Sequence, residues 1–136
     1  FNFNFEAQCL SRLDGQTLLS IPQLKGKRLL LTSGIAQPEG FTRLLEKHGG
    51  DIIGNLEFPD HHDYIFEDVQ KMQNEQDKLK PDYIVTTEKD AVKLRKFPEL
   101  LEILWILIIR VDPEDSWKSF FAEFLKQQFG ALNTDD

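Results

Sequence analysis

Residues 27–34 read KRLLLTSG and residues 38–50 read PEGFTRLLEKHGG, and these two segments together decide the fold. The first is a short apolar run of the kind found in buried strands, and the second has the composition of a helix. Pro38 suits the first turn of that helix, and Gly49 and Gly50 suit its end. A strand followed closely by a helix is the repeating unit of α/β domains.

The same alternation continues along the rest of the chain. Further strands are expected in residues 51–58, 82–87 and 103–111, and further helices in residues 66–80, 88–97 and 115–130. Right-handed crossovers between parallel strands place helices on both faces of the sheet. We therefore predict an α/β fold: a three-layer, Rossmann-like domain with a mostly parallel four-stranded sheet, preceded by a β-hairpin ribbon.

The first 25 residues predict that ribbon. Apolar residues occupy every second position, which is the period of a strand with one buried face: Phe1, Phe3, Phe5, Ala7 and Cys9. Asp14-Gly15 then predicts a type I′ turn between two antiparallel strands. We expect a linker ribbon over residues 1–25 and an α/β domain over residues 26–136.

Composition limits the function classes. The chain has 136 residues with 40% hydrophobic and 29% charged residues, which is ordinary for a globular protein. Its formal net charge of −7 argues against binding to nucleic acid or to an anionic membrane. The single cysteine, Cys9, excludes an internal disulfide, and no apolar run approaches the roughly 18 residues of a membrane span. Because the sequence begins at Phe1 rather than Met, we expect a fragment or a processed product.

Two adjacent histidines follow the strand expected at residues 51–58, in the stretch FPDHHDY at residues 58–64. A histidine can give and take protons near neutral pH, so His61 and His62 are candidates for proton transfer, and Asp60 can anchor the loop or orient a ring. A histidine pair that caps a helix or faces solvent is the alternative. A metal site built on these three residues has little support, because they have no partner cysteine.

A second distinctive stretch, TTEKDAVKL, covers residues 86–94. Thr86, Thr87 or Glu88 can cap the helix that follows, and Glu88 and Asp90 suit the positive end of its dipole. Lys89 can hold a phosphate beside the free amides of that helix, or it can pair with a neighbouring acid. The carboxyl ends of parallel strands share one edge of a sheet, so this stretch and FPDHHDY are expected to lie together there.

The sequence contains no glycine-rich loop that could hold a nucleotide phosphate. The motif G-x-x-x-x-G-K-[ST] does not occur, because the single Gly-Lys pair, Gly26-Lys27, is followed by Arg28. The motif G-x-G-x-x-G is also missing after every expected strand.

Three motifs occur in a fixed order: GIAQPEGF at residues 34–41, FPDHHDY at residues 58–64 with Asp68 beyond it, and TTEKDAVKL at residues 86–94. Together they resemble the C-terminal half of the tetraacyldisaccharide 4′-kinase family, the kinases of lipid A biosynthesis in Gram-negative bacteria. The resemblance runs from about Gly26 to Val111, and the hairpin before it resembles the ribbon between the two domains of that family. One departure is Ile65, where the family often has a threonine that caps the next helix.

The resemblance implies an ATP- and Mg²⁺-dependent transfer of phosphate to the 4′-hydroxyl of a disaccharide-1-phosphate lipid. It implies an N-terminal P-loop domain, missing from this chain, that holds ATP and Mg²⁺, so this fragment alone is expected to bind neither and to be inactive. The full-length protein would act at the cytoplasmic side of the inner membrane, whereas this part would be soluble, without a membrane span and without nucleic-acid binding.

The resemblance also implies roles for individual residues. His61 would be the catalytic histidine that partners an aspartate of the first domain, and Asp60 its catalytic neighbour in the loop. A further set would line or brace the cleft: His62, Thr86, Thr87, Glu88, Lys89 and Asp90. Two alternatives remain at this point, namely a non-catalytic domain that binds a nucleotide, a sugar phosphate or a protein, and a small metal hydrolase built on Asp60, His61 and His62.

Overall fold

The computed structural model describes residues 5–111, which form strands, α-helices and two 3₁₀ turns. The elements are β1 (Phe5–Arg12), β2 (Leu18–Ser20), β3 (Arg28–Ser33), α1 (Pro38–Lys47), β4 (Asp51–Glu57), α2 (Phe66–Leu79), β5 (Tyr83–Thr87), α3 (Glu88–Leu94) and β6 (Leu104–Val111), with 3₁₀ turns at Ile21–Leu24 and Pro98–Leu100. Nearly all of them belong to one unit, Ala7–Ile108. The second unit contains Phe5, Glu6 and residues 109–111 of the described range, and the helix expected at 115–130 lies outside that range.

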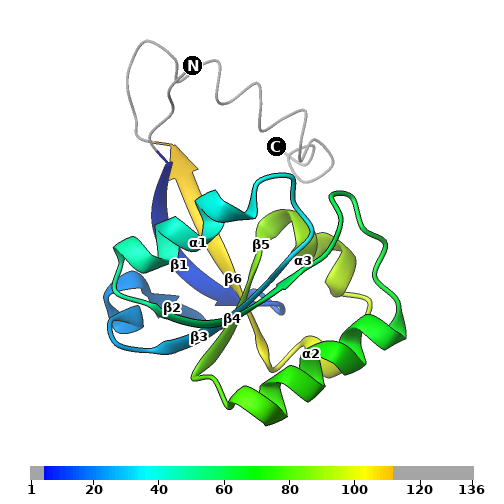
Figure 1. Ribbon diagram of the computed structural model, residues 1–136. Coiled ribbons are helices and arrows are strands. Elements are labelled where there is room, and N and C mark those ends of the chain that lie inside the picture. Colours follow the sequence, from blue (N-terminus) through cyan, green and yellow to red (C-terminus); the bar gives the residue numbers. More distant parts are fainter. Residues whose placement is uncertain (1–4, 112–136) are drawn as a thin grey trace. The chain divides into compact units, whose positions relative to one another are not determined.

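The strands form one six-stranded sheet in the order β2-β1-β6-β5-β3-β4 (Figure 1). The pairs β3–β4, β3–β5 and β5–β6 are parallel, and β1–β2 is antiparallel. The expected α/β class is therefore confirmed. The sheet has six strands rather than four, because the hairpin that we expected to precede the domain as a ribbon continues the sheet beside β6.

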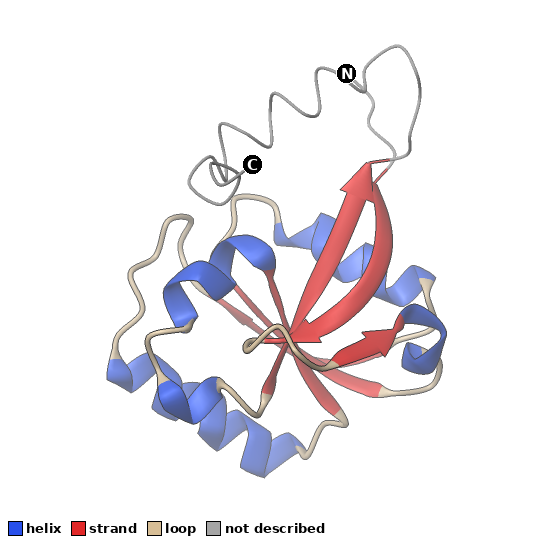
Figure 2. Cartoon of the chain, turned by 180° about the vertical axis from the view of Figure 1, so that it is seen from behind, coloured by secondary structure: helices blue, strands red, loops and turns tan. Residues whose placement is uncertain are grey.

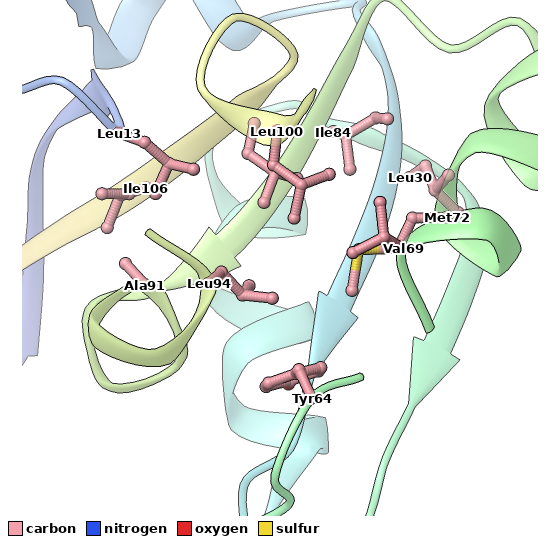
Figure 3. Close-up of a cluster of buried hydrophobic side chains, with 11 residues drawn as sticks. Leu13, Leu30, Tyr64, Val69, Met72, Ile84, Ala91, Leu94, Leu100 and Ile106 are labelled. Atoms are coloured by element: carbon pink, nitrogen blue, oxygen red, sulfur yellow. The ribbon is translucent and has the colours of Figure 1, made fainter. Parts of the chain in front are cut away.

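Helices cover both faces of this sheet. Figure 1 shows α1 on one side and α2 and α3 on the other, as right-handed crossovers require when β3 leads to β4 on one flank and β5 leads to β6 on the other. Leu30 and Ile84 point toward α2 and α3 and join their buried residues Val69 and Leu94 in one core cluster (Figure 3). Leu29 is equally buried but lies outside this cluster, near Gly50 and Leu45 at the end of α1, as the period of two in a strand requires.

The hairpin turn differs from the expectation. A type I′ turn needs positive φ at both central residues, but Gly15 has a φ of 77° whereas Asp14 is outside the positive region. The strands end at Arg12 and resume at Leu18, and the Asp14 side chain accepts a hydrogen bond from the Gln16 amide. The loop is therefore longer than two residues, and local hydrogen bonding of the aspartate decides its shape.

The carboxyl ends of β3, β4 and β5 lie together at one edge of the sheet, shown from behind in Figure 2. The connections from β3 and from β5 leave in opposite directions, so the space between these two strands is a topological switch point, the usual ligand position in open α/β sheets. In the described range, no helix is long and apolar enough to cross a membrane.

Candidate active site at the carboxyl edge of the sheet

Three loops converge at this edge, one after each of β3, β4 and β5. The loop of residues 58–64 follows β4 and contacts α3 through two lysines, Lys89 in its first turn and Lys93 in its last. Lys89 Nζ lies 2.7 Å from Asp60 Oδ1, and Lys93 Nζ donates to the His62 carbonyl at 2.9 Å. The two motifs that were expected to share this edge therefore do so.

His61 is the exposed histidine of the loop. Its side chain is 76% exposed, and Nε2 lies 3.6 Å from Asp60 Oδ2. Its φ of 63° lies in the left-handed region, which few residues other than glycine adopt, and such conformations persist where the surroundings enforce them. The imidazole is therefore held at the surface next to a carboxylate.

Asp60 connects His61 to α3. One of its oxygens accepts from Lys89 and the other faces His61. The hydrogen bond from Lys89 lowers the pKa of Asp60, and the nearby His61 adds to the same effect. Asp60 is therefore ionised at neutral pH. Because exposed ion pairs contribute little to stability, the pair with Lys89 acts mainly by fixing the position of Asp60.

His62 points away from the surface that His61 occupies. Its Nε2 lies 2.8 Å from Asp68 Oδ2, and its ring stacks on Phe58 with the centroids 4.9 Å apart. The same Asp68 oxygen accepts from the Ile65 amide at 2.9 Å. Asp68 therefore satisfies the backbone amide of Ile65 at the start of α2, where the apolar side chain of Ile65 offers no cap of its own. His62 stabilises the loop from within. It does not line the exposed rim, by which we mean the surface formed by Asp60, His61 and Lys89.

Asp90 is the centre of a buried network and is only 4% exposed. Its Oδ1 accepts from the Tyr64 hydroxyl at 2.8 Å and from the Gly34 amide at 3.0 Å, and its Oδ2 accepts from Thr87 Oγ1 at 2.6 Å. Burial raises the pKa of Tyr64, and the Asp90 carboxylate raises it further, so the phenol stays protonated and donates. One carboxylate thus joins the three loops that follow β3, β4 and β5.

The remaining predicted residues lie around this network. Thr87 caps α3, since its Oγ1 accepts from the Asp90 amide at 3.1 Å, as expected for one of the two threonines. Thr86 is fully buried in β5, and its hydroxyl has no hydrogen-bond partner among the described residues. It lies beneath the rim and offers no surface to a ligand there. Glu88 is half-buried in the first turn of α3.

The described residues of the rim are not arranged to hold a metal ion. Across residues 5–111, no group of three His, Cys, Asp or Glu side chains is arranged to hold a metal ion. Asp60 and His61 face solvent, whereas His62 is engaged with Asp68, so the three residues do not converge on one point. The geometry gives no support to the metal hydrolase alternative.

The sequence reasoning missed Gly34, Tyr64 and Lys93 as functional residues. A Cβ at Gly34 would lie 2.9 Å from the Pro59 carbonyl oxygen and 3.1 Å from the Tyr64 hydroxyl, so only glycine permits this approach. All three residues fall within or beside the quoted motifs, but their roles depend on partners that are distant in sequence. The sequence offered one local signal for these roles, the tyrosine that directly follows the polar residues of the loop.

Comparisons with known proteins identify the family. The chain matches the family described as tetraacyldisaccharide-1-P 4′-kinase over residues 2–128. It is 38% identical over 125 residues to a tetraacyldisaccharide 4′-kinase of Bdellovibrio bacteriovorus, covering 92% of this chain and 37% of that protein. It is 34% identical over 119 residues to the enzyme of the same name from Syntrophus aciditrophicus, covering 86% of this chain and 32% of that protein.

A crystal structure of LpxK from Aquifex aeolicus in complex with ATP has a similar fold. The TM-score is 0.54 at 22% identity, and the match covers 89% of this chain and 35% of the solved one. The chain therefore spans about a third of the length of the relatives that it matches.

Proposed function

The chain belongs to the tetraacyldisaccharide-1-P 4′-kinase family, and we propose that it is the C-terminal domain of an ATP-dependent lipid kinase. The reaction is transfer of the ATP γ-phosphate, with Mg²⁺, to the 4′-hydroxyl of tetraacyldisaccharide 1-phosphate in lipid A biosynthesis. An N-terminal P-loop domain of the same polypeptide holds the nucleotide and the metal. This domain supplies His61 to the shared cleft and does not catalyse the reaction alone.

The observation that carries this proposal is the presentation of His61. The imidazole is exposed, its backbone is held in the left-handed region, and the loop around it is attached on both sides. Lys89 fixes Asp60 before it, and Asp68 fixes His62 after it. A histidine that only filled space would not need such support, whereas one that must meet a group on another domain does.

The chemistry of phosphoryl transfer suits a histidine in this place. Such transfers depend on positioning and on charge stabilisation more than on covalent help from the protein. A carboxylate that takes the proton from a sugar hydroxyl works better when a neighbouring imidazole orients it and relays the proton. Asp60 Oδ2 lies 3.6 Å from His61 Nε2, so this carboxylate can orient the imidazole for that relay.

The test is turnover of the full-length enzyme with His61→Ala and His61→Gln. We expect kcat to fall by about 10²-fold or more in both variants, the usual scale for a proton-transfer residue, with KM for ATP little changed. His48→Ala is the matched control, because His48 caps the end of α1 and has no contact with the rim in the described structure. Near-normal turnover of His61→Ala would refute the role of His61.

A further inference from the structure

Besides the contacts of His62 with Asp68 and Lys93, the loop that carries His61 has two attachments that differ in their chemistry. On the outer side, the exposed ion pair between Lys89 and Asp60 joins the loop to α3. On the inner side, the Tyr64 hydroxyl donates to the buried Asp90 carboxylate. The outer contact is open to water and salt, so it restrains the loop weakly. The inner contact is shielded, and breaking it leaves a buried polar group without a partner.

The inner contact has the features of a fixed anchor. A Cβ at Gly34 would lie 2.9 Å from the Pro59 carbonyl oxygen and 3.1 Å from the Tyr64 hydroxyl, so the backbone before His61 and the Tyr64 side chain after it both lie close to the end of β3. The Tyr64 ring also meets the His62 ring edge-on, with the centroids 4.9 Å apart. Figure 3 shows Tyr64 at the end of the core cluster where the loop enters.

We propose that Tyr64 and Asp90 form a latch that fixes the loop of residues 58–64 and so positions His61 for the reaction. This inference rests on the proposed role of His61. Neither Tyr64 nor Asp90 touches the substrate; both are positioning residues. A phenylalanine at residue 64 would fill nearly the same volume, so the role of the hydroxyl is to orient the loop through its hydrogen bond and not to fill the core. The buried carboxylate accepts that hydroxyl at one defined orientation and thereby sets the path of the chain back to His61.

The latch predicts a specific pattern in a double-mutant cycle on the full-length enzyme. Tyr64→Phe should lower kcat by about tenfold, which corresponds to about 1.4 kcal/mol in the barrier, while KM for ATP stays the same. In the His61→Ala background, the same Tyr64→Phe change should have almost no further effect on kcat, because the latch acts through His61. Asp90→Asn, which keeps the shape of the side chain, should follow the same pattern more weakly.

Tyr83→Phe is the matched control, because it removes a tyrosine hydroxyl at the opposite end of β5. Amide hydrogen exchange in residues 59–62 should be faster in Tyr64→Phe than in the parent and unchanged in Tyr83→Phe. Unchanged kcat and unchanged exchange in Tyr64→Phe would overturn the latch. So would an equal loss of kcat in the parent and in the His61→Ala background, since a general loss of stability acts regardless of the side chain at position 61. Normal turnover of His61→Ala would instead defeat the proposed function itself.

Discussion

Asp90→Ala is the substitution that the structure predicts to be most damaging to stability. It removes the acceptor of three hydrogen bonds, from the Tyr64 hydroxyl, the Gly34 amide and the Thr87 hydroxyl. A buried donor without an acceptor costs about 1–3 kcal/mol, so three of them set an upper range of about 3–9 kcal/mol. Water that enters the space, and relief of the buried charge, offset part of this cost. We expect a net loss of about 2–4 kcal/mol in the free energy of unfolding.

Urea unfolding followed by circular dichroism measures this loss. With a slope of about 2 kcal/mol per molar, the midpoint should move down by about 1–2 M. Asp77→Ala is the control, because Asp77 lies on an exposed position of α2, where a substitution changes stability by about 0.5 kcal/mol or less. If Asp90→Ala shifted the midpoint no more than Asp77→Ala does, the reasoning that Asp90 joins three loops would be wrong.

Two predictions concern pH. The pKa of Tyr64 is raised in the folded protein, so above the ordinary tyrosine value of 10.0 the unfolded chain loses the phenolic proton first, and stability falls as pH rises. Urea midpoints between about pH 9 and 11 should therefore decline less steeply in Tyr64→Phe than in the parent, and equal slopes would contradict the burial of this phenol. The pKa of Asp60 is lowered below 3.8, chiefly by the hydrogen bond from Lys89, so its stabilising contribution is present above that value and is lost as pH falls through the lowered pKa. In Lys89→Gln an NMR titration should find the pKa of Asp60 closer to 3.8, and an unchanged value would exclude Lys89 as the cause.

Local signals in the sequence were sufficient for most of the fold. Pro38 begins α1 and Thr87 caps α3, because a helix start is decided by residues within one turn. The apolar run at residues 29–31 is buried in β3, as short continuous runs in parallel sheets are. The position of the hairpin in the sheet was not predictable in this way, because pairing beside β6 depends on contacts between the two ends of the described range.

The sequence predicted which edge of the sheet carries the candidate site but not how the side chains there are oriented. The order of strands and helices along the chain predicted which loops share the carboxyl edge of the sheet, and the composition of those loops predicted the rim. The inward orientation of His62 depends on its stacking with Phe58 and on its contact with Asp68, and Asp68 reaches it only because α2 packs beside the loop. For the same reason, nothing local to residues 86–90 indicated that Asp90 faces the interior while Lys89 faces the loop after β4.

The sheet order has a consequence for how the protein is made. Strand β1 emerges from the ribosome first among the described strands, yet its neighbour β6 is the last of them to be synthesised. Until β6 arrives, the edge of β1 that β6 will cover is unpaired, in addition to the outer edge of β2, and other chains can join it. The sheet can therefore be completed only after β6 has been translated. We expect chaperones to bind nascent chains most strongly between the synthesis of β1 and that of β6.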